Sequence, residues 1–258
     1  MRNLTVVCLI LLLVCGCSNG YDINDNQHTN DSIENDNLFL YDPIKNPITS
    51  GSISRIVPMS LEELELGSRM YKDEEPNPYT LILICEVAGP SINRIIMPPK
   101  SKMDYTKVYG TNHVITPILI HKIIYMGDYS NVKEGEIIFV AEPYFYITEE
   151  TPDYLDTLSL NSVWANEYYP MEAGNLYLTY MGLVTNELFA YNGSDTIYSI
   201  IGMREGVYNL SDPTPQNSAM ASMGIEPKGH TVEMWHDARA KYGYLVDAIM
   251  EAKAAEGK

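Results

Sequence analysis

The chain has 258 residues, of which 45% are hydrophobic, and its 34 acidic and 17 basic side chains give a net charge of −17 at pH 7. This length and apolar content suffice for one domain with a substantial core. The charge argues against nucleic acid and anionic lipid headgroups as partners, since both are negatively charged.

The first seventeen residues, MRNLTVVCLILLLVCGC, combine one early cation, Arg2, with an apolar run and small residues before Cys17. The run has the length of a signal-peptide core and falls short of the roughly 20 residues that a membrane span needs. The layout resembles the lipobox of bacterial lipoproteins. That resemblance implies a signal segment at residues 1–17, lipidation of Cys17, and a chain held at the outer face of the cell membrane. An uncut signal anchor and ordinary secretion are the alternatives.

Residues 18–51 are predicted to form a tether. The stretch Ser18–Asn37 consists mostly of Asn, Asp, Ser and Thr, and its low hydrophobicity and excess negative charge favour disorder. We expect this tether to continue to about Gly51 through Pro43 and Pro47, and a single domain to occupy residues 52–258.

The first half of the domain is predicted to begin with a helix and to continue with strands. Ser60-Leu61-Glu62-Glu63 matches a capping box, which opens a helix that reaches about Tyr71. Strands are expected at 80–87, 113–127 and 136–147, the last interrupted by Pro143. In the second strand the apolar alternation is lost after His121-Lys122, which predicts a β-bulge or strong bend.

Further strands are expected in the second half, at Asn175–Val184 and Glu187–Tyr191. Asn192-Gly193 predicts a type I′ hairpin turn that pairs the latter with TIYSII. The last element, Thr231 to about Ala254, is predicted to be a helix whose apolar face packs on the sheet through Val232, Trp235, Ala238, Tyr242, Leu245 and Ile249.

Strands and helices do not alternate along the chain, which argues against a parallel α/β sheet. We therefore expect a mainly β (α+β) domain. Its predicted form is a small OB-like antiparallel β-barrel with an N-terminal helix and a C-terminal amphipathic helix.

The segments SLEELELGSRMY, TLILICEVAG, HVITPILIHKIIYMGDYSNVKEGEIIFVAEP and YYPMEAGNLYLTYMG resemble an uncharacterised type of Gram-positive surface lipoprotein. Their order, over roughly Ser60–Ile201, is also similar to the OB-fold barrel of netrin-like domains, including the tissue inhibitors of metalloproteinases. This resemblance implies the fold. Those inhibitors reach a protease zinc ion through disulfide-braced N-terminal cysteines that this domain lacks, so no functional residue is carried over.

The residue patterns offer little catalytic chemistry. Cys85 follows Cys17 as the only later cysteine, and its place in the apolar run TLILICEV predicts a buried, unreactive thiol. The best metal-ligand pattern is His230, Glu233, His236 and Asp237, although acids in a first helical turn equally complement the helix dipole, which is the interpretation we favour. The sequence contains no HExxH, GxGxxG or phosphate-loop motif, and we expect no cofactor and no metal.

Two groups of residues are candidates for ligand binding, because OB-type barrels often bind with their loops and one strand face. The cations Arg94, Lys100, Lys102 and Lys107 fall in the expected loop from Gly89 to Asn112, and Tyr144 and Tyr146 fall near a predicted strand. A solvated loop and a half-buried β surface are the plainer interpretations of the same residues.

The expected function is a lipid-anchored, extracytoplasmic interaction domain at the bacterial cell surface, without catalysis. Its partner would be a surface protein or an envelope polymer. The alternatives are a cell-envelope enzyme acting on wall polymers and the solute-binding lipoprotein of a transporter.

Overall fold

The computed structural model describes residues 38–40, 48–50, 60–69, 76–94, 113–147, 163–165, 168, 170–185, 196–201, 206–211 and 229–256. The described strands are β1 (Leu38–Phe39), β2 (Ile48–Ser50), β3 (Thr80–Val87), β4 (Ser91–Arg94), β5 (His113–Met126), β6 (Ile137–Glu142), β7 (Tyr144–Tyr146), β8 (Val163–Ala165), β9 (Tyr177–Thr185), β10 (Thr196–Ile200) and β11 (Val207–Asn209). The described helices are α2 (Leu61–Arg69) and α5 (Gly229–Glu256).

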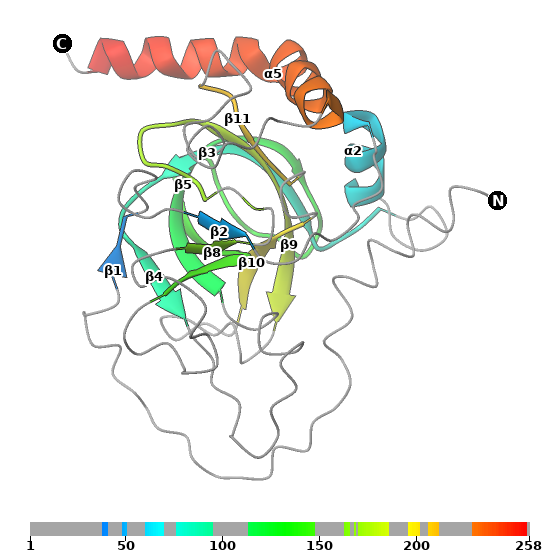
Figure 1. The fold of residues 1–258 in the computed structure, drawn as a ribbon. Coiled ribbons are helices and arrows are strands. Elements are labelled where there is room, and N and C mark those ends of the chain that lie inside the picture. Colours follow the sequence, from blue (N-terminus) through cyan, green and yellow to red (C-terminus); the bar gives the residue numbers. More distant parts are fainter. Residues whose placement is uncertain are drawn as a thin grey trace.

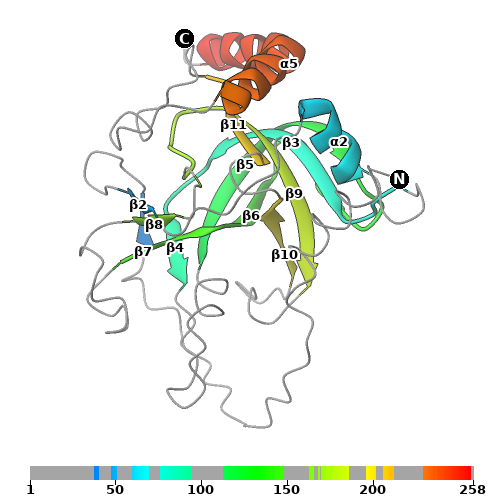
Figure 2. The ribbon, with the colours of Figure 1, turned by 45° about the vertical axis from the view of Figure 1, so that its right-hand side comes forward.

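Five strands close into a barrel in the order β3, β5, β6, β10, β9 and back to β3. Neighbours around the barrel are antiparallel except β6 and β10, which run parallel where the barrel closes. Figures 1 and 2 show these strands curving around one another, with β11 extending from β9 toward α5. The expected mainly β, OB-like barrel with a C-terminal helix is confirmed, and the parallel closing pair is the one departure from an antiparallel arrangement.

The long strand β5 pairs with β3, β4 and β6, and it bends along its length. Its register with β3 shifts twice, so that His121 and Ile124 are extra residues between paired positions. Such bulges increase local twist and curvature, which lets a single strand belong to both sides of a small barrel. The bulge expected near His121-Lys122 is therefore confirmed.

Both faces of β3 are buried, in two different cores. Leu81, Leu83 and Cys85 point into the barrel, whereas Ile82 and Ile84 belong to an outer layer shared with α2 and α5. A strand covered on both faces needs apolar residues at every position rather than at alternate ones. This double burial explains the continuous run TLILICEV.

The two helices cover one part of the outer face of the barrel, over β3, β9 and β11 (Figure 2). The capping box at the start of α2 is confirmed, because the Ser60 N–H donates to Glu63 Oε2 at 2.8 Å and the Glu63 N–H donates to Ser60 Oγ at 3.1 Å. In α5, Trp235, Ala238 and Tyr242 are buried as expected. Neither described helix is both long and apolar enough to cross a membrane.

Two short strands lie within residues 18–51, which the sequence assigns to the tether. β1 pairs antiparallel with β4, and β2 pairs parallel with β8. Strand addition depends on main-chain hydrogen bonds to strands far away in the sequence, which no local residue pattern reveals. Both strands precede the expected boundary at residue 52, while residues 1–37, including Cys17, lie outside the described part of the chain.

The pairing of β10 differs from the expected hairpin. Thr196 lies opposite Thr185 and Ile200 opposite Met181, so the described partners of β10 are β9 and β6, and the expected partner segment 187–191 lies outside the described residues. The Asn192-Gly193 turn itself falls outside the described residues. The Asn192-Gly193 signal is local, whereas the pairing of β10 with β9 and β6 depends on closure of the barrel.

Candidate functional site

Glu142, the last residue of β6, is a fully buried carboxylate inside the barrel. It accepts hydrogen bonds from the Thr116 hydroxyl, from the Tyr168 hydroxyl at 2.7 Å and from the Met171 backbone N–H at 3.0 Å. Thr116 Oγ1 in turn lies 2.9 Å from Ser91 Oγ. A buried carboxyl group is costly unless it is hydrogen-bonded, so this network is what allows an acid at the centre of the fold.

The surroundings of Glu142 change its acidity. Burial raises the pKa of its carboxyl group to about 7, although the hydrogen bonds from Thr116, Met171 and Tyr168 oppose that change. Glu142 therefore exchanges its proton near neutral pH, where an ordinary glutamate is fully ionised.

Other titratable side chains share the barrel interior with Glu142. The rings of Tyr144 and Tyr168 are stacked with centroids 6.0 Å apart, and Tyr177 and Cys85 complete the group. Burial raises the pKa of the Cys85 thiol to about 12 and holds the pKa of Tyr168 well above its usual value. Cys85 is thus the buried, neutral thiol that the sequence predicts.

The structure describes three of the six predicted ligand-binding residues, Arg94, Tyr144 and Tyr146. Tyr144 is only 1% exposed, which corrects the expectation that its ring faces a surface ligand. Tyr146 and Arg94 are half-buried and come from adjacent segments, because the Asn93 amide donates to the Tyr146 carbonyl at 2.7 Å and accepts from its N–H at 2.8 Å. Burial also lowers the pKa of the Arg94 guanidinium. Lys100, Lys102 and Lys107 lie outside the described residues.

The acidic residues at the start of α5 face solvent. Glu233, His236 and Asp237 are exposed, and the His236 ring packs edge-on against Trp235 at 5.0 Å. Among the residues that the structure describes, no group of three or more His, Cys, Asp or Glu side chains has metal-binding geometry. The His230 side chain lies outside this description.

Sequence reasoning missed an exposed aromatic group, which we name the tyrosine shelf and define as Tyr79, Met126 and Tyr129. The two tyrosine rings lie 4.9 Å apart at 57°, and the three side chains are 42%, 42% and 61% exposed. Tyr79 directly precedes β3, and Met126 and Tyr129 lie at the end of β5 and in the turn that follows. The sequence indicates only the two turns that carry this group, through the prolines of PNPY and the turn residues of GDYSN.

The backbone of the shelf is held by close contacts between two turns. The Tyr129 N–H donates to the Pro78 carbonyl at 2.9 Å, and the Gly127 N–H donates to the Thr80 carbonyl at 2.8 Å. Gly127 is required by this approach, because a Cβ at that position would lie 2.5 Å from the carbonyl carbon and oxygen of Pro78. The two tyrosines are therefore presented by a fixed platform.

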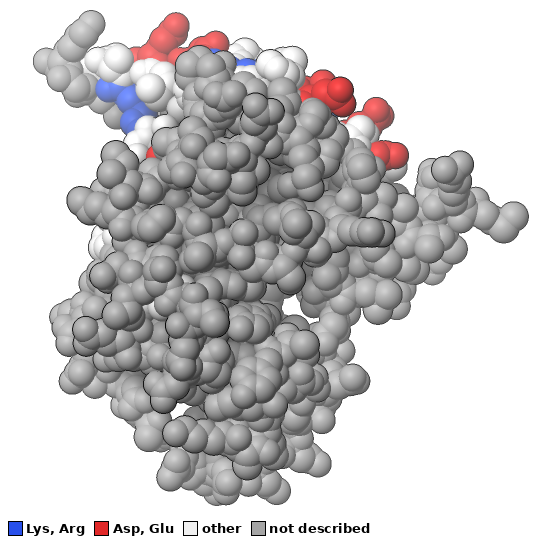
Figure 3. All heavy atoms as spheres, in the orientation of Figure 1, with Lys and Arg blue, Asp and Glu red and all other residues white. Residues whose placement is uncertain are grey.

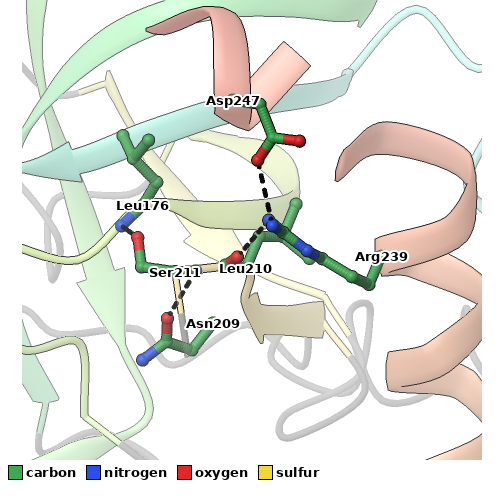
Figure 4. A network of polar contacts seen from close by, with 6 residues as sticks. All are labelled: Leu176, Asn209, Leu210, Ser211, Arg239 and Asp247. Carbon is green, nitrogen blue, oxygen red and sulfur yellow. Dashed lines mark hydrogen bonds and ion pairs between the residues drawn. The ribbon is translucent and has the colours of Figure 1, made fainter. Parts of the chain in front are cut away.

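A further polar network fastens α5 to the barrel (Figure 4). Arg239 Nη1 donates to the Leu210 carbonyl at 2.6 Å, and its Nη2 lies 3.0 Å from Asp247 Oδ1. Below this pair, Ser211 Oγ accepts from the Leu176 N–H at 2.8 Å, and Asn209 Oδ1 accepts from the Ser211 N–H at 3.0 Å. These contacts satisfy backbone groups at the end of β11, so the network is structural.

Acidic side chains dominate the visible surface of the two helices. Figure 3 shows red atoms along α5 and at α2, with lysine and arginine atoms gathered mainly toward one end of α5. The exposed acids there include Glu62, Glu63, Glu233, Asp237 and Glu251. On the shelf itself, Asp128 is an exposed acid between Met126 and Tyr129. This surface favours positively charged partners.

No protein-family model matches the chain, and neither a curated protein nor a solved structure matches it. The functional assignment therefore depends on the chain's own residues.

Proposed function

We propose that the chain is a lipid-anchored, extracytoplasmic interaction domain at the bacterial cell surface and that it binds a protein partner through the tyrosine shelf. The shelf is the observation that carries this proposal, because two exposed aromatic rings are presented by turns whose backbones hydrogen-bond to one another. The leader that ends at Cys17 supports the anchoring.

The shelf has the character of a binding hot spot. Tyrosines supply large, partly apolar contact areas with few rotatable bonds, and a preformed platform lowers the entropy lost on binding. The described barrel interior is filled by side chains such as Tyr144 and Tyr168, each less than 2% exposed. Binding at the outer surface is therefore favoured over binding inside the barrel.

Charge selects the class of partner. The chain carries a net charge of −17, and Asp128 places an exposed carboxylate beside the shelf. A protein surface with lysine or arginine side chains would gain from this field and from contact of its cations with the tyrosine faces. An anionic envelope polymer would be repelled by the same field.

Site-specific photo-crosslinking in intact cells tests the binding face. A photoreactive residue at position 129 should crosslink a defined protein, and the same residue at position 244 should not. Tyr244 is the matched control, since it is an exposed tyrosine on a different element, α5. Replacing Tyr79 with alanine should remove most of the adduct at position 129. Adducts to a polysaccharide, or identical adducts from both positions, would contradict the proposed partner.

Replacement of Cys17 by serine tests the anchor separately. The wild-type chain should partition into detergent with the membrane fraction, since acyl burial contributes about 0.8 kcal/mol per CH2 group. The variant should be released or remain unprocessed. Equal partitioning of both chains would refute lipidation at Cys17 without bearing on the shelf.

A further inference from the structure

The tyrosine shelf is too small to be a whole protein-binding site, and α2 lies beside the start of β3, where the shelf begins (Figure 2). Stable protein interfaces bury about 800 Å² on each partner, contributed by roughly 20–30 residues. Three side chains supply a small part of that area, so a protein bound at the shelf must also contact neighbouring elements. The Thr80 hydroxyl donates to the Ser68 carbonyl, which joins the last turn of α2 to the residue that follows Tyr79.

A second contact continues the surface from β5 to α2. Tyr125 directly precedes Met126 of the shelf, and its half-buried side chain packs against the outer apolar cluster. Leu61 and Leu64 of α2 belong to that same cluster. The shelf therefore adjoins α2 through both of the strands that lead to it, β3 and β5.

The solvent-facing side of α2 is partly apolar and partly acidic. The buried side consists of residues that recur at helical spacing, namely Leu61, Leu64, Glu65 and Ser68. The exposed side, which we name the α2 face, is defined as Glu62, Glu63 and Leu66, whose spacings of three and four place them together. Leu66 is 61% exposed, as much as Tyr129 on the shelf. The α2 face therefore offers an apolar contact next to two carboxylates.

Charge determines what can bind across both parts of this surface. Glu62 and Glu63 are exposed on α2, and Asp128 is exposed on the shelf. Lys241, the described cation that contacts α2, is paired with the buried Glu65 carboxylate, so its charge is already matched. The three exposed acids are complementary to lysine and arginine side chains, and Leu66 and the tyrosines are complementary to apolar ones.

We propose that the tyrosine shelf and the α2 face form one docking surface for a cationic segment of the partner protein. An apolar side chain of that segment packs on Leu66, and its lysine or arginine side chains face Glu62, Glu63 and Asp128. This docking surface presupposes the proposed function, because it specifies the chemistry of the protein that the shelf binds. It adds a contact on a separate element, which binding at the shelf alone does not require.

Photo-crosslinking at position 66 tests whether the shelf and the α2 face share a partner. In intact cells, a photoreactive residue there should crosslink the same protein as position 129, through a peptide that contains lysine or arginine. Glu62→Lys should reduce both adducts several-fold. Glu251→Lys makes the same charge change near the C-terminal end of α5, which lies away from α2 (Figure 1). This control should leave both adducts within about twofold, because exposed charges more than roughly 8 Å apart are largely screened at physiological salt.

A defined probe tests the same chemistry with the purified full chain. The probe is a fluorescent peptide in which one leucine is flanked by lysines, and its binding is followed by fluorescence anisotropy at low salt. Leu66→Ala and Tyr79→Ala should each weaken its binding several-fold. Leu66→Ala should have little effect on a peptide of lysines alone, which has no apolar side chain to place on Leu66. A peptide with glutamates in place of the lysines should not bind, and equal binding of that peptide would refute the charge complementarity.

The outcomes separate the docking surface from the function that it presupposes. If Tyr79→Ala weakens binding of the leucine–lysine peptide while Leu66→Ala and Glu62→Lys do not, the shelf binds alone and the docking surface on α2 is refuted. Different proteins crosslinked from positions 66 and 129, or a polysaccharide or lipid crosslinked from position 66, would refute it too. If position 129 crosslinks no protein, the proposed function itself fails. Because Leu66 and Glu62 are exposed, both variants should keep the wild-type free energy of unfolding, so lost binding does not reflect lost folding.

Discussion

The hydroxyl of Tyr242, in α5, donates a hydrogen bond of 2.6 Å to the Glu65 carboxylate, in α2. Tyr180 of β9 donates to the same oxygen at 3.1 Å, and the Lys241 amine contacts the other. Glu65 is only 5% exposed. One carboxylate thus joins both described helices to the outer face of the barrel, although Glu65 and Tyr242 are far apart in the sequence.

Replacement of Tyr242 by phenylalanine should destabilise the fold by about 1–3 kcal/mol at pH 7, because a buried carboxylate loses a short donor. Burial alone raises the pKa of Glu65, but the hydrogen bonds from Lys241, Tyr242 and Tyr180 outweigh it and lower the pKa below 4.5. The stabilisation is therefore present above the ordinary pKa and lost as the pH falls through the lowered one. Urea unfolding of both chains at pH 7 and pH 3 should show a difference that shrinks in acid. Glu62→Gln, at an exposed position of α2, should change stability little at either pH.

A second prediction concerns the replacement of Gly127, which lies in the backbone beneath the tyrosine shelf. An alanine Cβ there would lie 2.5 Å from Pro78 backbone atoms and 2.6 Å from the Asn77 carbonyl oxygen, and neither group is a flexible side chain. Gly127→Ala should therefore cost about 1–3 kcal/mol or more in unfolding free energy and should weaken crosslinking at position 129. Gly89→Ala is the matched control, since its Cβ would meet nothing nearer than Pro117 Cγ at 3.7 Å. Equal melting temperatures for the two variants would contradict this view of Gly127.

Much of the fold could be predicted because its signals are local. The capping box at Ser60 and Glu63, the loss of alternation at His121 and the apolar face of α5 each reflect a preference visible within a few residues. The strand pairing of β10 was harder, because the Asn192-Gly193 signal is local whereas the register with β9 is set by the closed barrel.

The candidate site was predicted poorly for a physical reason. Glu142 sits in the alternating segment 136–147, where an acid before Pro143 looks like a solvated strand end. Its burial depends on Thr116, Tyr168 and Met171, which come from separate parts of the chain. Likewise, the ring contact between Tyr79 and Tyr129 exists only because two distant turns meet. Neither arrangement leaves a pattern along the sequence.

Arg239 supports a third prediction, about how α5 is held. Its hydrogen bond to the Leu210 carbonyl is part-buried, whereas Asp247, its ion-pair partner, is 65% exposed. Arg239→Ala should lower the unfolding free energy by about 1–2 kcal/mol, because a backbone carbonyl loses its charged donor. Asp247→Ala should cost less than about 1 kcal/mol, as exposed ion pairs do. Urea titrations of the two variants measure both losses of unfolding free energy. A larger loss from Asp247→Ala would show that the ion pair, and not the hydrogen bond to Leu210, holds α5.

Glu142 should also give the global stability of the chain an unusual dependence on pH. Its pKa in the folded chain, raised by burial to about 7, exceeds the ordinary value of 4.5, so the folded chain holds this proton more tightly than the unfolded one. The free energy of unfolding should therefore fall as the pH rises from 5 to 8, by about 3 kcal/mol for a full shift of this size. In Glu142→Gln this contribution should vanish, so the difference between the two chains should favour the variant increasingly toward pH 8. Urea unfolding at pH 5, 6, 7 and 8 measures it directly, and parallel stability curves for the two chains would show that Glu142 remains ionised throughout.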